Sequence, residues 1–150
     1  MPWQDLLASN RVDRHTTSRQ ELDDLRAAAD RNLRDAAVPR LSADNRFGLA
    51  YEAVVILAKM AIGCAGYRVK AYGGHQTTFA ALPLAMGREA SGEAAYFDAC
   101  RRKRNILSYD RADVATDTEA AELLRRAREF RRAVEAWIAG KHPRLARNAG

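Results

Sequence analysis

The chain has 150 residues, of which 47% are hydrophobic and 29% are charged. This length and composition exclude a disordered or low-complexity segment and predict a single globular domain over residues 1–150. The formal net charge is +6 and the pI is about 9.7. That balance favours a polyanionic partner such as RNA, DNA or a nucleotide, but it suits equally well a basic surface that only keeps the protein soluble.

Several classes of site and location are not expected. The two cysteines, Cys64 and Cys100, fall in apolar helical contexts and are expected to be buried thiols rather than a disulfide. No metal-ligand cluster, phosphate loop or nucleophile motif is recognisable, so we expect no metal and no cofactor. The longest apolar stretch, 47–67, contains Glu52 and Lys59 and favours a core helix over a membrane span. Without a secretory signal at the N-terminus, a cytoplasmic protein is expected.

The first half of the chain predicts two helices after a mixed leader. Residues 1–15 form that leader, with one short amphipathic turn. Ser18 precedes a glutamate by three residues and offers a capping box for a first helix that ends before Pro39. Ser42 caps a second helix over about 43–68, which is apolar around most of its circumference and is expected at the centre of a bundle.

The second half predicts three more helices. A shorter helix over about 76–86 should be kinked by Pro83. The fourth helix covers about 92–109. Thr116 opens a second capping box, and the fifth helix then continues to about Ala139.

The last residues, 141–150, are expected to be a basic and frayed tail. No strand-like alternation persists along the chain. The predicted fold is therefore all-α, an antiparallel bundle of about five helices with short connections.

A basic run on the fourth helix is the most informative stretch. It consists of Arg101, Arg102, Lys103 and Arg104. Arg104 falls on the same helical stripe as Phe97 and Cys100, and an arginine on an apolar stripe needs a partner. Either it forms an ion pair, with Asp98 or a carboxylate of the first helix, or it belongs to a functional site.

Polar side chains follow the basic run. Asn105 and Tyr109 are four residues apart and share a helix face. Arg104 points about 140° away from Tyr109 on a regular helix, so one helix cannot aim both at one atom. They can meet only if the helix ends between them or if a second copy of the chain contributes, which favours a homodimer with a shared cleft.

The segment Arg104-Asn105-Ile106-Leu107-Ser108-Tyr109 resembles the motif of the HEPN family. HEPN domains are small helical bundles marked by an arginine, a polar residue that is often asparagine, and a histidine four to six residues beyond the arginine. The helical order fits over about residues 18–139, and Arg46-Phe47, Ala50-Tyr51 and Gly74-His75 look like patterns of bacterial members. The resemblance implies metal-independent RNA cleavage by paired arginines and histidines across a dimer cleft, in a toxin–antitoxin or defence setting.

This chain departs from the HEPN motif at one position. Tyr109 occupies the histidine position, and a phenol with a pKa near 10 is a poor base, although it can donate a hydrogen bond or stack on a nucleobase. Arg104 and Asn105 match the arginine and the polar residue of the motif. Tyr109 stands at the histidine position but does not match its residue type. His75 is a second-tier candidate to replace the missing imidazole in space. The expected nucleic-acid contacts are Arg101, Arg102 and Lys103, with Asp98 beside them.

Three functions remain open on the sequence. The chain binds or processes RNA, with ribonuclease activity in doubt because of Tyr109. Alternatively, it is a non-catalytic module that pairs with a nucleotidyltransferase, as the HEPN resemblance implies. A third reading is a nucleotide-binding regulator whose basic run grips phosphates.

Overall fold

A computed structural model of the chain describes residues 2–71, 74–107 and 113–148. Over these residues the chain forms six α-helices, two short 3-10 turns and one two-stranded sheet. The predicted all-α bundle is confirmed. The additional helix is α1 (Trp3–Ala8), which lies where the sequence indicated only one short turn.

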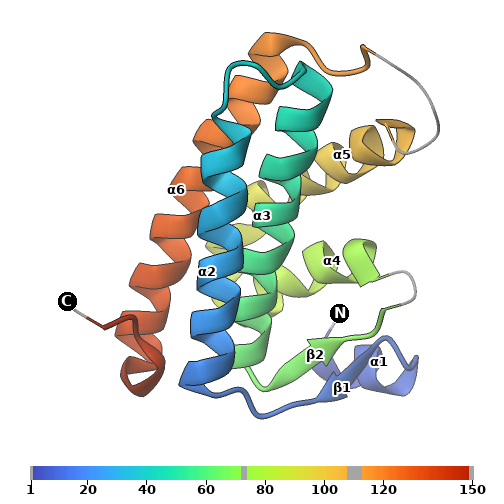
Figure 1. The fold of residues 1–150 in the computed structure, drawn as a ribbon. Helices are drawn as coiled ribbons and strands as arrows, with labels where there is room; N and C mark the ends of the chain where they lie inside the picture. Colours follow the sequence, from blue (N-terminus) through green and yellow to red (C-terminus); the bar gives the residue numbers. More distant parts are fainter. Residues whose placement is uncertain (1, 72–73, 108–112, 149–150) are drawn as a thin grey trace.

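Three long helices form the main body of the bundle. They are α2 (Arg19–Ala36), α3 (Ala43–Cys64) and α6 (Asp117–Lys141). Figure 1 shows α2 running antiparallel to the other two, with α3 in the middle of the molecule. Each helix begins after a hydroxyl cap that accepts a backbone N–H from the residue three positions on, as the sequence predicts; the caps are Ser18, Ser42 and Thr116.

Two shorter helices cross the long ones. They are α4 (Gly74–Met86) and α5 (Ser91–Leu107), joined through the 3-10 turn Arg88–Ala90. Gly87 separates them with a φ of 103°, a conformation that favours glycine. The C-terminal half of α5 extends away from the long helices (Figure 1). The predicted continuation of this helix to residue 109 lies outside the described residues.

A small sheet corrects the expectation that the chain has no strands. Helix α3 ends at Cys64 rather than near residue 68, because Gly66 takes a φ of 100° and turns the chain. Strand β2 (Tyr67–Val69) then pairs antiparallel with β1 (Val12–Arg14). Strands of three residues are too short to leave an alternating pattern, which is why the sequence did not indicate them.

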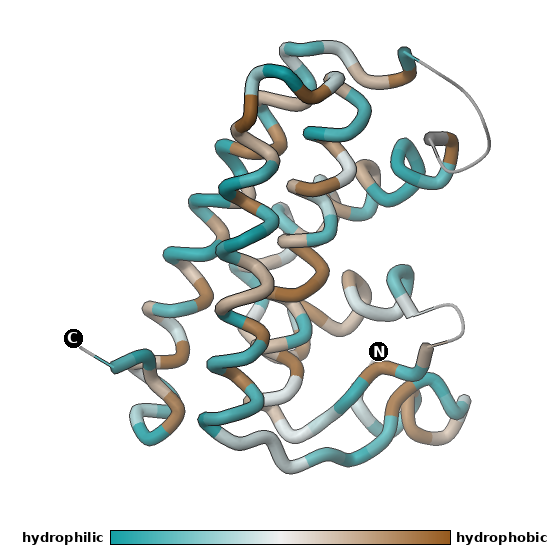
Figure 2. The backbone as a smooth tube through the Cα atoms, in the orientation of Figure 1, coloured by the Kyte–Doolittle hydropathy of each residue, from teal (hydrophilic) through white to brown (hydrophobic). Residues whose placement is uncertain are grey.

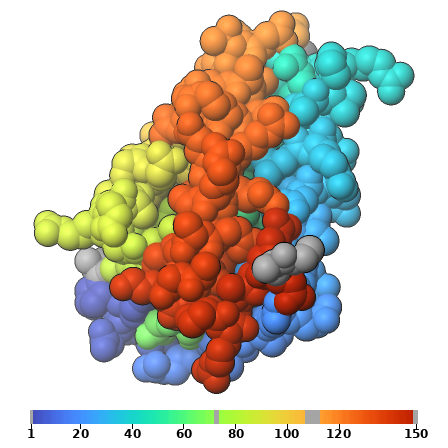
Figure 3. All heavy atoms as spheres, turned by 90° about the vertical axis from the view of Figure 1, so that its left-hand side faces the viewer, coloured from blue at the N-terminus to red at the C-terminus, as the bar shows by residue number. Residues whose placement is uncertain are grey.

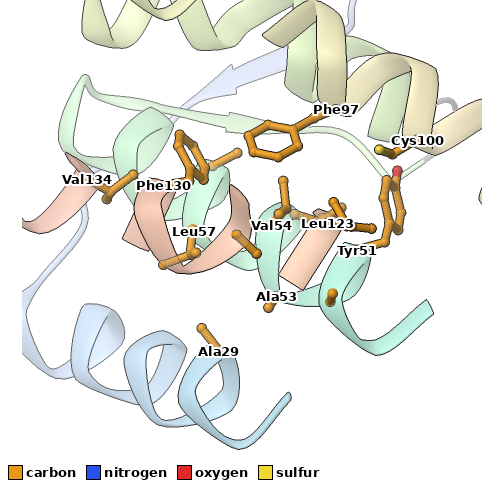
Figure 4. Close-up of a cluster of buried hydrophobic side chains, with 14 of the residues drawn as sticks. Ala29, Tyr51, Ala53, Val54, Leu57, Phe97, Cys100, Leu123, Phe130 and Val134 are labelled. Atoms are coloured by element: carbon orange, nitrogen blue, oxygen red, sulfur yellow. The ribbon is translucent and has the colours of Figure 1, made fainter. Parts of the chain in front are cut away.

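The core is built around α3. Twelve of its 22 residues are buried, and the brown apolar segments of Figure 2 lie mostly on the inner sides of the helices. Phe97 of α5 is fully buried and packs against Phe130 of α6, with 5.0 Å between the ring centroids. Figure 4 shows this pair above Val54 and Leu57, with Tyr51 at the edge of the same cluster.

By length and apolar composition α3 could cross a membrane, but 67% of its most apolar 18-residue window is buried inside the protein. Core helices of soluble proteins commonly pass the same test. The finding fits the central bundle helix that the sequence predicts.

The two cysteines are free thiols. Cys100 is buried and Cys64 is half-buried, so the expected burial is complete for only one of them. Burial raises the pKa of each thiol to about 11. Both side chains are therefore protonated near neutral pH.

The C-terminal segment is packed where the sequence predicts fraying. Pro143–Leu145 forms a 3-10 turn after α6. Arg26 of α2 donates from Nη2 to the Leu145 carbonyl at 2.8 Å, and Arg147 lies 2.8 Å from an Asp30 carboxylate oxygen. These contacts to α2 order the chain as far as residue 148.

Replacing Phe97 by alanine should destabilise the fold strongly, because it leaves a cavity where α3, α5 and α6 meet. We expect the free energy of unfolding to fall by about 3–5 kcal/mol in urea denaturation. The Phe97→Leu variant keeps most of the buried volume and should lose less. Equal stability of Phe97→Ala and the parent chain would show that this contact is not part of the core.

Candidate functional site

The charged side of α3 is the starting point of the candidate site. Glu52 is the one carboxylate in the sequence between Asp44 and Glu89. It lies within the apolar part of α3, one residue after the buried Tyr51. Its side chain is 40% exposed, on the side of α3 that α5 approaches. A charge on an otherwise buried helix has to face solvent or an opposite charge.

Arg104 of α5 supplies that opposite charge. Its Nη2 lies 3.5 Å from Oε1 of Glu52, and the Arg104 side chain is 31% exposed. Gly48, one turn earlier on α3, leaves room for the arginine: a Cβ at that position would stand 3.4 Å from Arg104 Nε. The expected partners, Asp98 or a carboxylate of the first helix, are therefore wrong for this ion pair.

The other cations of the basic run point in different directions. Asp98 accepts hydrogen bonds from Arg101 Nε at 2.7 Å and from Arg102 Nη1 at 3.0 Å. Lys103 instead reaches Glu119 of α6, at 2.7 Å. Successive residues on a helix are about 100° apart, so the run spreads around α5 rather than forming one patch. Arg101 and Arg104 are the two that act electrostatically on groups of α3 and α4.

His75 reaches the same side of α3 from the first turn of α4. Its Nδ1 lies 3.0 Å from the hydroxyl of Tyr51. Burial, reinforced by the Glu52 charge, raises the pKa of Tyr51 above its ordinary value of 10, so the phenol stays protonated. Because the hydroxyl has no other hydrogen-bond partner among the described residues, we assign it as the donor to Nδ1. The neutral imidazole then carries its proton on Nε2.

The neutral form of His75 is the favoured one. Partial burial of the ring lowers its pKa below the ordinary 6.5; Glu52 opposes this shift, and Arg104, Lys59 and Arg101 add to it. The ring therefore offers an Nε2–H donor near neutral pH. To act as a base, it would have to move that proton and give up the hydrogen bond from Tyr51. The arrangement is better suited to binding an anion than to accepting a proton.

Two of the motif residues are not observed beside Glu52, Arg104 and His75. Asn105 is exposed and forms no hydrogen bond with another residue that the structure describes. Tyr109 lies outside the described residues. The structure thus brings Arg101, Arg104 and His75 to one side of α3, and Asp98 accepts a hydrogen bond from Arg101. No metal site accompanies them: the described residues contain no group of three His, Cys, Asp or Glu side chains placed to hold an ion.

Glu52 and Tyr51 were not predicted from the sequence as members of the site. A signal was present for Glu52, since a lone carboxylate in a long apolar stretch needs a partner. For Tyr51, an aromatic residue on the inner stripe of a core helix gives no sign that its hydroxyl meets a histidine 24 residues later.

No protein-family model, curated protein sequence or solved structure matches this chain.

The depressed pKa of His75 should make the stability of the fold depend on pH. At a pH between the lowered pKa of the folded chain and 6.5, His75 binds a proton in the unfolded chain but not in the folded chain. The free energy of unfolding therefore falls as the pH drops below about 6.5. A His75→Gln variant lacks this loss. Urea denaturation at pH 7.5 and 5.5 should show the parent chain losing more stability than the variant, by less than about 1 kcal/mol because the ring is partly exposed. The opposite sign would contradict the assigned environment.

Proposed function

We propose that this chain is an RNA-binding protein of the HEPN type, which holds RNA phosphates with Arg101 and Arg104 and donates to them from His75. The observation that carries the proposal is that a cation of α5 and an imidazole of α4 share one partly exposed side of α3. The Arg104 charge contributes to lowering the pKa of His75. Guanidinium groups beside a neutral N–H donor make a phosphate-binding arrangement.

The weakness of the Glu52–Arg104 pair supports this proposal. The two side chains are 31–40% exposed and their charged atoms are 3.5 Å apart, so the pair contributes only about 0–1 kcal/mol to stability. A phosphate oxygen can compete with the Glu52 carboxylate for the Arg104 guanidinium. Arg104 can then bind a phosphate through two parallel hydrogen bonds.

Binding without cleavage is the expected activity. Metal-independent cleavage through the RNA 2′-hydroxyl needs a base, and Tyr109 at the motif position is a poor one. His75 has its Nδ1 occupied by Tyr51 and its proton on Nε2. The Arg104-Asn105 resemblance places such a protein in a toxin–antitoxin or defence setting, where an RNA-binding subunit has a clear use.

A second candidate function is pairing with another protein, as the HEPN resemblance implies. Ile106 is the one large hydrophobic residue that is exposed in the described part of the chain, at 41%. It lies beside the basic run, at the end of α5 that projects from the bundle (Figure 1). A second copy of the chain or a nucleotidyltransferase could cover it. Light scattering on the parent chain and on Ile106→Ser would test self-association: a monomeric parent contradicts the homodimer.

RNA binding can be tested by fluorescence anisotropy with a short single-stranded RNA. We expect the affinity to fall steeply between about 50 and 200 mM salt, because bound phosphates release counterions. Arg104→Gln and Arg101→Gln should each weaken binding about tenfold, which corresponds to about 1.4 kcal/mol. Arg125→Gln is the matched control: it removes the same charge from the exposed face of α6, where Arg125 pairs with Glu122 and Glu129.

Two results would contradict the proposal. One is the absence of salt-sensitive RNA binding. The other is an equal loss of affinity in Arg104→Gln and Arg125→Gln, which would mean that only the total charge matters. Gel analysis of the same mixtures in the presence of a chelator tests the expectation that RNA remains intact; cleavage that Arg104→Gln abolishes would make the protein a ribonuclease.

A further inference from the structure

A second group of cations surrounds a cavity at the opposite end of α3. The cavity has a volume of about 510 Å3 and lies where the start of α2, the end of α3 and the segment after α6 converge. Figure 3 shows the C-terminal residues, in red, lying across this end of the bundle next to the blue N-terminal part. The ionisable residues that line the cavity are His15, Arg19, Cys64, His142 and Arg144. No carboxylate is among the described residues that line it.

Arg19 and Arg144 have no carboxylate partner among the described residues. Arg19 donates from Nη2 to the neutral amide of Asn148, and its Nε is shielded from solvent without a hydrogen bond. Arg144 is exposed and makes no hydrogen bond or ion pair with another described residue. A shielded guanidinium nitrogen without an acceptor is costly, and a ligand oxygen would satisfy it.

Carboxylates near this end of the molecule are already engaged elsewhere. Arg26 pairs with Glu135 at 2.8 Å, and Arg131 and Arg147 both pair with Asp30, at 2.6 and 2.8 Å. Among the described residues, no carboxylate therefore pairs with the two arginines at the cavity.

Glu21 does not line this cavity, although it bonds to two residues that do. It accepts hydrogen bonds from His15 and Thr17, which lower its pKa and fix it on the wall of a smaller neighbouring cavity. The permanent positive charges on the cavity wall are those of Arg19 and Arg144.

The partial charges at the helix ends do not account for the positive potential of this cavity. The start of α2 places positive amide groups near the cavity, but α3 and α6 end near it and present negative carbonyl groups. These partial charges, about half a unit each, largely oppose one another. The guanidinium groups carry the attraction, and two of them match the charge of a terminal phosphate, which carries between one and two negative charges near neutral pH.

From these contacts we infer that the Arg19–Arg144 cavity binds a phosphate monoester, either on a free nucleotide or at the 5′ end of an RNA. Its volume of about 510 Å3 lies within the range of roughly 300–1,000 Å3 that is usual for ligand sites. At His15 and Gly63 it meets a chamber of about 170 Å3 with apolar walls that include Leu25, Ile62 and Val69. That chamber gives the body of the ligand an apolar surface beside the phosphate.

Calorimetry on the full chain tests the inference with five probes: inorganic phosphate, AMP, adenosine, and one RNA oligonucleotide with and without a 5′ phosphate. We expect a phosphorylated probe to bind more tightly than its unphosphorylated counterpart. Arg19→Gln and Arg144→Gln should each weaken that binding about tenfold or more. Binding of AMP identifies a free nucleotide as a source of the phosphate, and preference for the phosphorylated RNA identifies an RNA end.

Arg40→Gln is the matched control, because Arg40 is exposed in the turn at the far end of α2 and its loss removes the same charge. Arg104→Gln separates the two sites: it should leave AMP binding unchanged, while Arg19→Gln should leave binding of the unphosphorylated RNA unchanged. Equal affinities for phosphorylated and unphosphorylated probes, no binding at millimolar concentration, or unchanged binding in both Arg19→Gln and Arg144→Gln would overturn the inference. None of these results depends on whether the Arg104 site binds RNA.

Discussion

Helix α3 is packed against α2, α4, α5, α6 and β2, and the positions of the charged groups follow from that packing. A helix covered on so many sides can carry charge only where an opening or an opposite charge is available. Glu52 occupies such a place, and Arg104 of α5 meets it there. The carboxylate of the core helix thus meets one guanidinium group of the basic run, while Arg101 and Arg102 pair with Asp98 on α5 itself.

Tyr51 belongs both to the hydrophobic core and to the Arg104–His75 site. Its ring is fully buried beside Phe79, and its hydroxyl bonds to His75 at the start of α4. Since Tyr51 and Glu52 are consecutive on α3, the phenol and the carboxylate are about 100° apart around the helix axis. Two consecutive residues of the core helix therefore contact α4 through His75 and α5 through Arg104. Such placement on regular elements holds binding groups more firmly than a loop would.

Much of the fold could be predicted from local chemistry. The caps at Ser18, Ser42 and Thr116 indicate where the long helices begin, and the all-round apolar pattern of α3 indicates its central position. Contacts between helices could not be predicted, because no pattern along one helix identifies its partner residue on another. The sequence singled out Arg104 as a residue that needs a partner, but its pairing with Glu52 and the Tyr51–His75 bond are visible only in three dimensions. The packed C-terminal segment was missed for the same reason, since its contacts are to α2.

Arg104 and Glu52 act in opposite directions on the pKa of His75 at one side of α3, and ¹⁵N NMR titration of the His75 ring measures both effects. We expect a pKa below 6.5, with the proton of the neutral ring on Nε2. That pKa should rise in Arg104→Gln, fall further in Glu52→Gln and stay unchanged in Arg125→Gln. A pKa that is the same in all four proteins, or that lies above 6.5 in the parent chain, would contradict the placement of His75 beside Glu52 and Arg104.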